Sequence, residues 1–295
     1  ANGGIGYDAP QSFRTVENNE QSTPTQTNEL LNRLGHMPSK KLGQNFLVDA
    51  NIVRKSLELA DVRAGDVVVE VGPGLVTLTG ALLGRGAKVY AVELDKRLYS
   101  HLTEYFADCP NLSLINADAV NRPLAALPAE VTDFKIVANL PYAISTPWLD
   151  EVLSGKLPSK MSLMLQKEAA LRFAAKNASG EFSPISIFLS CAYDVLTPHK
   201  VSAACFFPRP KVDSMLLPLS LKKNPFLFRP RAKSIIRKLF SHRRKQIGSI
   251  IKTAGDDAPI LELWLEKVPE LDPRARPEAV PADYWKILDE AAAEK

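Results

Sequence analysis

The alternation of two kinds of segment predicts an α/β fold with a mostly parallel sheet. Short β-branched runs lie within residues 66–74 and 88–95, and each is followed by a segment of helical periodicity, at 78–86 and 96–106. Gly-Pro-Gly ends the first run in a tight turn, and a glycine ends the first helix. Because strand–helix–strand connections within one sheet are right-handed crossovers, this order predicts parallel strands covered by helices on both faces.

The rest of the chain continues this pattern and then changes. Strands are expected at 112–120, 134–142 and 213–221, a helix at 146–155, and a strand running into a helix at 160–175. From Lys222 onwards only helical periodicity is present. We therefore expect a polar, disordered extension over 1–36, an α/β domain over 37–221 and a smaller all-helical domain over 222–295.

Length and composition exclude several classes of protein. The 295 residues, 45% of them hydrophobic and 24% charged, have the balance of a globular protein with one large or two modest domains. No apolar run approaches the length of a membrane span, and the N-terminus lacks the pattern of a secretion signal. Three scattered cysteines and four isolated histidines predict neither a disulfide framework nor a metal site. We expect a cytoplasmic protein, or alternatively an organellar one, without membrane or metal partners.

Basic residues are concentrated in one stretch of the predicted helical domain. Residues 222–252 contain eleven Lys or Arg and no acid, and subtracting these charges from the net charge of +4 leaves −7 on the rest of the chain. So dense a stretch in an otherwise mildly acidic chain indicates a polyanionic partner, nucleic acid first. The alternative is a solvated helix face, although such faces usually carry both signs of charge.

Glycines and an acid at two successive strand ends predict a site for a nucleoside-containing cofactor. Gly72 and Gly74 follow the first strand, where glycine lets a ligand approach the backbone and the next helix directs its N-terminal amides to the sheet edge. Glu93 ends the second strand 21 residues after Gly72, the usual offset for a carboxylate that binds ribose hydroxyls. The third glycine of the NAD fingerprint is absent, a loss that S-adenosylmethionine tolerates because it has no phosphates. A structural turn with a surface glutamate is the alternative.

The next two strand ends add groups to the same edge of the sheet. Asp118 offers a carboxylate to an adenine amine, and Asn139 begins the motif Asn-Leu-Pro-Tyr. The Asn139 side-chain oxygen and the Leu140 carbonyl are acceptors that can draw an exocyclic amine toward tetrahedral geometry and free its lone pair. Pro141 helps to hold the preceding carbonyl in place, and Tyr142 offers a face for stacking an extruded base. The alternative is an ordinary strand-ending loop.

Ordered blocks along most of the chain carry a family resemblance. They are KKLGQNFLVD (40–49), EVGPG…LT (70–79), VELD (92–95), NADAV (116–120), NLPYAIS (139–145), LMLQKEAALR (163–172), FFPRPKVDSMLL (206–217) and IRKLFSHRRKQI (236–247). The sequence resembles the small-subunit ribosomal RNA adenine dimethyltransferases, the kasugamycin-resistance family. Relatives of that family include the erythromycin-resistance methylases and mitochondrial transcription factor B. The resemblance implies a Rossmann-like S-adenosylmethionine-dependent methyltransferase sheet with a smaller all-helical C-terminal domain.

The resemblance also implies roles for individual residues. Cofactor contacts are implied for Gln44, Asn45, Leu47, Gly72, Gly74, Glu93, Asp118 and Asn139, and the target-base motif is Asn139, Leu140, Pro141 and Tyr142. The first three match a motif that closes over the methionine part of the cofactor. Two positions depart from the family pattern: Val76 stands where a small residue is common, and Ala143 replaces a frequent asparagine. They bear on loop geometry and affinity more than on reaction class.

The basic segments resemble family segments that lie near ribosomal RNA. Pro208 and Pro210 are expected to stiffen one loop. Phosphate contacts are expected from Arg209, Lys211, Lys233, Arg237, Arg243, Arg244 and Lys245. An apolar stripe on the C-terminal helices is expected to pack; it comprises Ile236, Leu239, Phe240, Ile247, Ile250 and Ile251. Lys233, Arg237 and Arg244 are expected on another face of these helices, with Arg243 and Lys245 flanking it.

The resemblance implies a monomeric enzyme that dimethylates N6 of two adjacent adenosines in the last hairpin loop of small-subunit rRNA. Its partners would be that rRNA and the precursor of the small ribosomal subunit, with a compatible role in subunit assembly. One rival is a methylase of a large-subunit rRNA adenine, as in antibiotic resistance. Another is a ribosome-assembly or transcription-factor-like protein that binds RNA or DNA. The intact Asn-Leu-Pro-Tyr motif favours chemistry, and the basic segments favour the small subunit.

Overall fold

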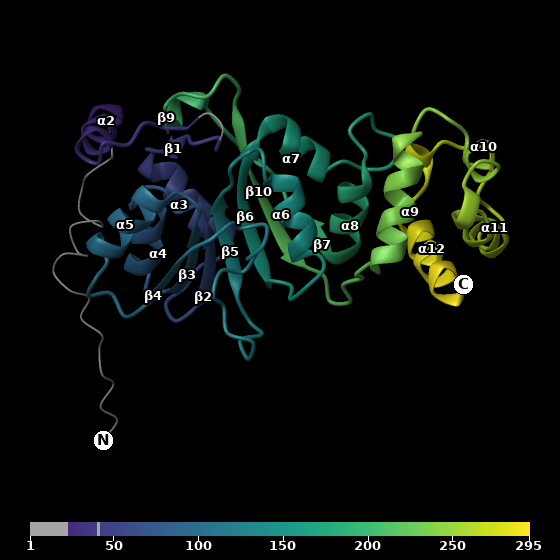
Figure 1. Cartoon of the computed structure of the whole chain (residues 1–295), viewed down its shortest axis with the longest axis horizontal. Helices are drawn as coiled ribbons and strands as arrows, with labels where there is room; N and C mark the ends of the chain where they lie inside the picture. Colours follow the sequence, from purple (N-terminus) through teal and green to yellow (C-terminus); the bar gives the residue numbers. More distant parts are fainter. Residues whose placement is uncertain (1–22, 40–41) are drawn as a thin grey trace. The chain divides into compact units, whose positions relative to one another are not determined.

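The computed structural model describes residues 23–39 and 42–295, and the chain forms two compact units (Figure 1). The first unit contains the described residues up to Trp148, Pro158–Lys167 and Leu196–Leu219, and the second contains Leu149–Leu157, Glu168–Val195 and Ser220–Lys295. The sequence places the domain division at residue 222. The last segment of the second unit begins near that point, and two earlier segments belong to this unit as well.

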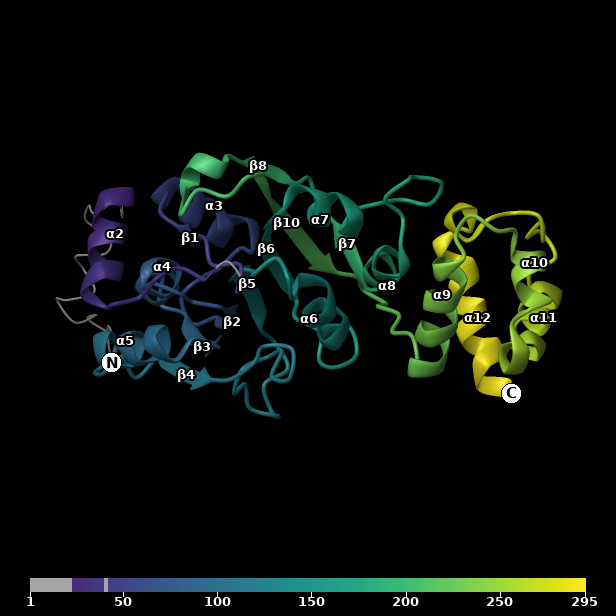
Figure 2. The ribbon, with the colours of Figure 1, turned by 45° about the horizontal axis from the view of Figure 1, so that its top comes forward.

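A sheet of mainly parallel strands forms the centre of the first unit. Its strands follow the order β4-β3-β2-β5-β6-β10, so that β10 lies beside β6 (Figure 2), and β8 pairs with β10 in antiparallel orientation. The bounds are Val67–Val71 for β2, Lys88–Glu93 for β3, Leu112–Asn116 for β4, Lys135–Asn139 for β5, Lys160–Gln166 for β6, His199–Val201 for β8 and Ser214–Leu221 for β10. The pairs β2–β3, β3–β4, β2–β5 and β5–β6 are parallel, as predicted.

Side chains of the central strands are buried on both faces of this sheet. Val68 of β2 and Val89 of β3 are fully buried in one cluster with residues of two helices, α3 (Ala50–Leu59) and α4 (Thr77–Gly84). Val69, whose side chain points to the opposite face, is also fully buried. A strand buried on both faces has a continuous apolar sequence, which explains why this run was recognisable.

The parallel register brings the carboxyl ends of the strands to one edge. Val71 at the end of β2 lies opposite Val92 of β3, and Asn139 at the end of β5 lies opposite Met164 of β6. Helices α5 (Lys96–Tyr105) and α6 (Ser145–Val152) follow β3 and β5. The loops that leave β2, β3, β4 and β5 therefore meet at this edge, where open α/β sheets bind ligands.

The segment before β2 adds a helix and a short strand to the first unit. Helix α2 (Pro24–Arg33) begins after Thr23, whose hydroxyl accepts a hydrogen bond from the Gln26 amide at 3.2 Å, and its Leu31 is buried. This capped, packed helix corrects the prediction of disorder for residues 23–36, whereas residues 1–22 lie outside the described part. Strand β1 (Phe46–Leu47) pairs with β9 (Phe206–Phe207), a segment far away in the sequence.

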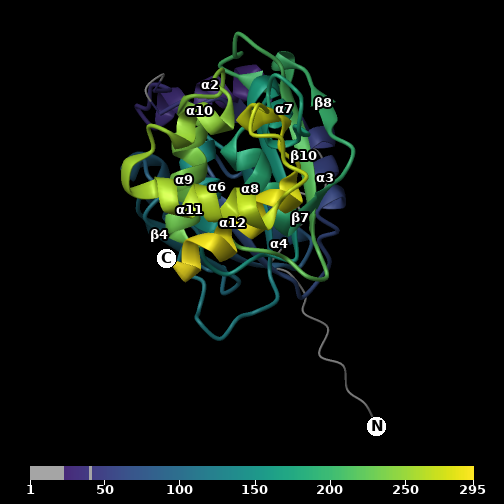
Figure 3. The ribbon, with the colours of Figure 1, turned by 90° about the vertical axis from the view of Figure 1, so that its right-hand side faces the viewer.

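Helices dominate the second unit. They are α7 (Lys167–Phe173), α8 (Pro184–Ala192), α9 (Pro230–Ser241), α10 (Ile247–Ile251), α11 (Ala258–Lys267) and α12 (Ala282–Glu294), with a short strand β7 (Tyr193–Val195). Residues 222–295 form only helices and loops, as predicted. Helices α11 and α12 pack side by side (Figure 3), and their buried Trp264 and Trp285 stack with ring centroids 5.0 Å apart. Trp148 is fully buried in the first unit.

Candidate active site

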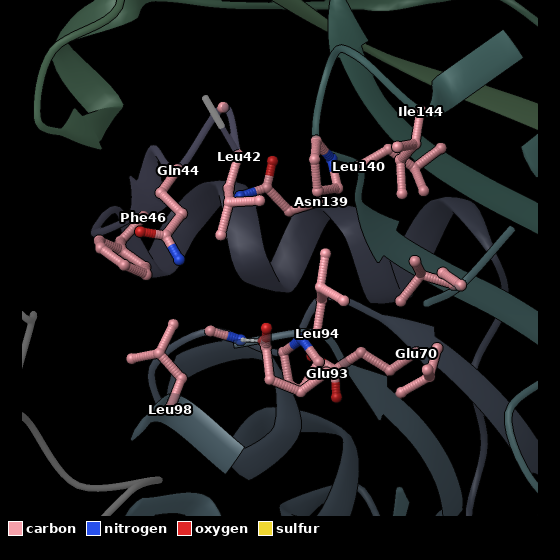
Figure 4. Close-up of a pocket in the computed structure, with 18 of the residues that line it drawn as sticks. Leu42, Gln44, Phe46, Glu70, Glu93, Leu94, Leu98, Asn139, Leu140 and Ile144 are labelled. Carbon is pink, nitrogen blue, oxygen red and sulfur yellow. Dashed lines mark hydrogen bonds between the residues drawn. The ribbon is translucent and has the colours of Figure 1, made fainter. Parts of the chain in front are cut away.

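The predicted cofactor and target-base residues line one pocket at the carboxyl edge of the sheet (Figure 4). The predicted residues that line it are Gln44, Asn45, Leu47, Gly72, Gly74, Glu93, Asp118, Asn139, Leu140, Pro141 and Tyr142. The fold thus brings together residues that are spread over about a hundred positions of the sequence.

Two glycines with positive φ shape the turn after β2. Gly72 and Gly74 have φ angles of +64° and +62°, which residues with a Cβ rarely adopt. A Cβ on Gly74 would lie 3.1 Å from ring carbons of Phe46, so that glycine at position 74 lets β1 pack closely against this turn. Val76, one of the departures from the family pattern, precedes α4 and does not line the pocket, whereas Ala143, the other departure, does line it.

Glu93 presents a nearly buried carboxylate beside the glycine turn. Its side-chain oxygens accept hydrogen bonds from the amides of Gly74 at 3.0 Å and of Asp95 at 2.9 Å, and the residue is 5% exposed. Burial raises the pKa of Glu93, and these backbone hydrogen bonds oppose the shift. Because each carboxylate oxygen has two lone pairs, each can accept a further hydroxyl. This arrangement suits a carboxylate that holds two ribose hydroxyls.

Glu70 is a pocket residue that the sequence motifs did not single out. It is fully buried, and its Oε2 accepts a hydrogen bond from the Thr79 hydroxyl at 2.8 Å. Its Oε1 has no hydrogen-bond partner among the described residues. Burial and the nearby charge of Glu93 raise the pKa of Glu70 to about 8. The signal in the sequence was an acid within the otherwise apolar run VVVEV.

Asp118 lies in the turn that follows β4. Its Oδ1 accepts a hydrogen bond from the Val120 amide at 2.8 Å, which fixes the carboxylate against its own turn. The side-chain amide of Asn116 donates to the backbone oxygen of Glu93 at 2.8 Å and so ties the end of β4 to the end of β3. These bonds hold the Asp118 and Glu93 carboxylates on neighbouring strand ends of one pocket.

One hydrogen bond determines the orientation of the Asn139 side chain. Its Nδ2 donates to the backbone oxygen of Asn45 at 3.1 Å. Because only the nitrogen of an amide side chain can donate, this bond assigns the other position to Oδ1. Oδ1 has no hydrogen-bond partner among the described residues and remains available as an acceptor in the pocket.

The residues after Asn139 are held from several sides. The Leu140 amide donates to the backbone oxygen of Met164 at 3.2 Å. The ring of Pro141 packs against the glycine turn, since a Cβ on Gly72 would lie 3.6 Å from its Cδ. Tyr142 is half-buried and its hydroxyl hydrogen-bonds with that of Ser214 at 3.1 Å. Burial raises the pKa of this phenol, so it stays neutral at physiological pH.

Most cations of the basic run at 222–252 form ion pairs with five acids of the second unit. Seven of its eleven cations form ion pairs there: Lys222 with Asp194, Arg229 with Asp289, Arg231 and Lys238 with Asp257, Lys233 and Arg237 with Asp150, and Arg243 with Glu278. Lys223, Arg244, Lys245 and Lys252 are exposed and form no ion pair within the described part of the chain. These five acids offset five of the eleven positive charges, so the run presents less positive charge than its sequence suggests.

The position of Lys233 corrects one of the predicted RNA contacts. Lys233 is 4% exposed, and its ammonium donates to Asp150 Oδ1 at 3.1 Å, to the Ser154 hydroxyl at 2.6 Å and to the Leu153 backbone oxygen at 3.3 Å. It cannot contact a phosphate without losing these bonds. Instead it places a positive charge at the C-terminal end of α6, where the helix dipole favours one.

Arg209 and Lys211 occupy the loop that follows β9. Both are exposed, and neither forms an ion pair among the residues that the structure describes. Phe206 of β9 lies opposite Leu47 of β1, and Leu47 lines the pocket. The loop therefore presents two unpaired cations a few residues away from the wall of the pocket.

Comparison with known protein families decides the wider assignment. A family model described as ribosomal RNA adenine dimethylase matches residues 35–268, a range that contains every pocket residue discussed above. The chain belongs to the ribosomal RNA adenine dimethylase family. The resemblance inferred from the sequence motifs is therefore confirmed, and so is the Rossmann-like methyltransferase fold with a helical C-terminal part.

Relatives of this dimethylase match nearly its whole length. Ribosomal RNA small subunit methyltransferase A of Opitutus terrae is 55% identical over 271 residues, which cover 90% of this chain and 97% of that protein. The protein of the same name from Clostridium botulinum is 34% identical, and the match covers 89% of this chain and 97% of that protein. Two solved structures share the fold. One is a dimethyladenosine transferase from Plasmodium falciparum, with a TM-score of 0.65 and 24% identity over 81% of this chain and 94% of that chain. The other is the 23S rRNA methyltransferase ErmE, with a TM-score of 0.59 and 25% identity over 84% of this chain and 100% of that chain.

Metal and membrane features are absent from the described residues. These residues contain no group of three or more His, Cys, Asp or Glu side chains placed to hold a metal ion. No helix in residues 23–39 or 42–295 is long and apolar enough to cross a membrane. The three cysteines, Cys109, Cys191 and Cys205, are free thiols.

Proposed function

We propose that this chain transfers methyl groups from S-adenosylmethionine to adenines of small-subunit ribosomal RNA. The observation that carries the proposal is the fixed orientation of Asn139, which leaves Oδ1 as a free acceptor in the same pocket as the Glu93 carboxylate. Membership of the dimethylase family supports adenine as the target. The name of the Opitutus terrae relative supports the small subunit.

The donor groups of the pocket fit S-adenosylmethionine. Glu93 would hold the ribose hydroxyls with its remaining lone pairs, and Asp118 would accept from the adenine amine. Gly72 and Gly74 would let the ligand approach the backbone, and Asn45 and Leu47 would line its methionine end. When bound, the cofactor supplies a methyl group on a positively charged sulfur.

The chain's own contribution to the reaction is to position and polarise the amine. Asn139 Oδ1 and the Leu140 carbonyl would accept hydrogen bonds from the two amine hydrogens, which frees the nitrogen lone pair for attack. Tyr142 would stack on the base, and its hydrogen bond with Ser214 holds the ring in place. The nitrogen becomes positively charged, and therefore acidic, only once it is methylated, so its proton can then pass to water without a strong base. Acceleration then comes mainly from positioning.

The substrate we propose is the pair of adjacent adenosines in the last hairpin loop of small-subunit rRNA, each dimethylated on N6. Arg209 and Lys211 in the loop after β9, and Arg244 and Lys245 in the second unit, are exposed cations that would contact phosphates. Methylation on immature small subunits would couple the enzyme to subunit assembly.

The deciding experiment is methyl transfer from labelled S-adenosylmethionine onto immature small subunits, followed by mapping of the modified nucleotides. We expect label on two adjacent adenosines of the terminal hairpin. Label in large-subunit rRNA would support the rival methylase, and RNA binding without any transfer would support a binding protein.

A pair of variants tests the role of Asn139. Asn139→Ala should lower transfer by on the order of 100-fold or more, because the acceptor on the amine is lost, while rRNA binding is retained. Asn121→Ala, which changes an exposed asparagine in the loop after β4, is the matched control and should transfer normally. Substantial residual transfer by Asn139→Ala would contradict the mechanism.

A further inference from the structure

A polar network joins the N-terminal part of the pocket wall to the turn between β3 and α5. Gln44 Oε1 accepts hydrogen bonds from the Ser39 amide at 2.7 Å and from His36 Nε2 at 3.0 Å. Gln44 Nε2 donates to Asp95 Oδ2 at 3.2 Å. His36 is 6% exposed and its ring lies edge-on to Phe46, with centroids 6.4 Å apart. We call these four residues, His36, Ser39, Gln44 and Asp95, the Gln44 network.

Two groups of the Gln44 network can act only as a hydrogen-bond donor or only as an acceptor, and they fix the orientation of the other side chains. The Ser39 amide can only donate, and the Asp95 carboxylate can only accept, so Gln44 must direct Oε1 to the first and Nε2 to the second. Since Oε1 is an acceptor, His36 must carry its proton on Nε2. The side chain of Gln44 thus makes three hydrogen bonds within the protein, whereas that of Asn139 makes one.

The network continues into the predicted ribose site. Asp95 Oδ1 accepts hydrogen bonds from the amides of Arg97 and Leu98 at the start of α5, at 2.9 and 3.3 Å. The Asp95 amide donates to Glu93 Oε1, and Glu93 Oε2 accepts from the Gly74 amide. A continuous chain of hydrogen bonds therefore runs from His36 through Gln44 and Asp95 to Glu93 and the glycine turn.

The neighbours of Gln44 in sequence contact the other parts of the pocket. A Cβ on Gly43 would lie 3.5 Å from the Tyr142 amide nitrogen, and the Asn45 backbone oxygen accepts from Asn139. The ring of Phe46 packs against Gly74. Residues 43–46 therefore touch both the target-base motif and the glycine turn, and Gln44 is the member of this segment whose side chain anchors it to Asp95.

We propose that Gln44 is a positioning residue and not a cofactor ligand. Through Asp95 and His36 it holds residues 42–47 against the sheet edge and so completes the wall of the cofactor pocket. This replaces the direct cofactor contact predicted for Gln44 from the sequence. The inference rests on the proposed function in one respect, namely that the pocket binds S-adenosylmethionine.

A polarity swap between Gln44 and Asp95 tests this role. Gln44→Glu places two carboxylates face to face, and Asp95→Asn places two amide nitrogens face to face, so that each single variant breaks the network. In the double variant Gln44→Glu/Asp95→Asn, the new amide nitrogen at position 95 can donate to the new carboxylate at position 44. The other oxygen of that carboxylate still accepts from Ser39 and His36, and the amide oxygen at position 95 still caps α5. Asp108→Asn, an exposed acid beyond the other end of α5, is the matched control.

The expected result is a loss of cofactor affinity that the swap restores. Each single variant should raise the Kd and the KM for S-adenosylmethionine roughly tenfold or more, since a charge-assisted hydrogen bond is lost. At saturating cofactor kcat should fall as well, because residues 43–46 touch the target-base motif and the Asn45 backbone oxygen orients Asn139. The double variant should return to within about threefold of the wild-type Kd. Wild-type affinity in both single variants, or a double variant no better than the worse single, would overturn the proposal.

A second readout separates this proposal from the proposed function. Amide hydrogen exchange of residues 42–47 in the cofactor-free protein should be faster in both single variants and slow again in the double variant. This measurement needs no ligand. If the wild type fails to bind S-adenosylmethionine while exchange follows this pattern, the proposed function fails and the Gln44 network stands; unchanged exchange in the single variants refutes the network.

Discussion

Replacing Glu70 with glutamine should remove a pH dependence from the stability of the protein. Glu70 is fully buried beside Glu93, and its pKa is raised to about 8, mainly because burial penalises the charged form. In the unfolded chain the same carboxyl returns to about 4.5. Between these values the folded state binds a proton that the unfolded state has released. Stability is therefore greatest below the unfolded pKa and falls as pH rises toward the folded pKa.

The size of the effect follows from the two pKa values. Each pH unit within this window costs about 1.4 kcal/mol, so the wild type should lose roughly 3–4 kcal/mol from this group between pH 5 and pH 8. Glutamine does not titrate and keeps the acceptor for the Thr79 hydroxyl. Between pH 5 and pH 8 the unfolding free energy of the wild type should therefore fall by this amount relative to that of Glu70→Gln.

The assay is urea unfolding followed by circular dichroism at pH 5, 6, 7 and 8 for both proteins. The slope against pH is the test, because the offset at any one pH also contains the cost of burying the glutamine NH₂ group. Glu104→Gln removes an exposed carboxyl of α5 as the control and should run parallel to the wild type. Parallel curves for Glu70→Gln and the wild type would refute the reasoning.

Three further predictions concern the pocket and the basic residues. Gly74→Ala should destabilise the protein by about 1–2 kcal/mol and raise the KM for the cofactor, since the φ of +62° and the Phe46 ring 3.1 Å away both oppose a Cβ; thermal unfolding and kinetics check this. Tyr142→Ala should lower kcat/KM for rRNA by on the order of 10–100-fold through lost stacking, whereas Tyr142→Phe, which loses only the bond to Ser214, should retain most activity; equal losses would contradict a stacking role. Replacing Arg244 and Lys245 with glutamine should weaken rRNA binding and reduce the slope of log K against log salt by about 1–2. Lys233→Gln should instead destabilise the protein by about 3 kcal/mol and leave that slope unchanged. If Lys233→Gln alters the salt slope, Lys233 is a phosphate contact after all.

Features that depend on local sequence could be predicted. The run at 67–71 is apolar because β2 is buried on both faces, and the glycines after it have the positive φ that the turn requires. Parallel strands then bring their carboxyl ends together, so the order of elements alone placed Glu93, Asp118 and Asn139 at one edge. The chemistry of each residue type and the position of its strand end were sufficient to predict this part of the site.

Features that depend on partners distant in sequence could not be predicted. The acids that neutralise the basic run lie outside it; Asp150, for example, pairs with Lys233 across 83 residues and buries it. Gln44 lies within a recognisable motif, yet its role depends on Asp95, 51 residues away. The sequence shows which charged and amide side chains are present, but not which of them form ion pairs or hydrogen bonds with one another in the fold.

The placement of the three tryptophans provides an intrinsic optical probe of each unit. Trp148 is buried in the first unit, whereas Trp264 and Trp285 are buried and stacked in the second. Emission from Trp264→Phe/Trp285→Phe would report on the first unit alone, and emission from Trp148→Phe on the second alone. Coincident fluorescence transitions in denaturant would show that the units unfold as one cooperative system. Separate transitions would give a free energy for each unit without cutting the chain.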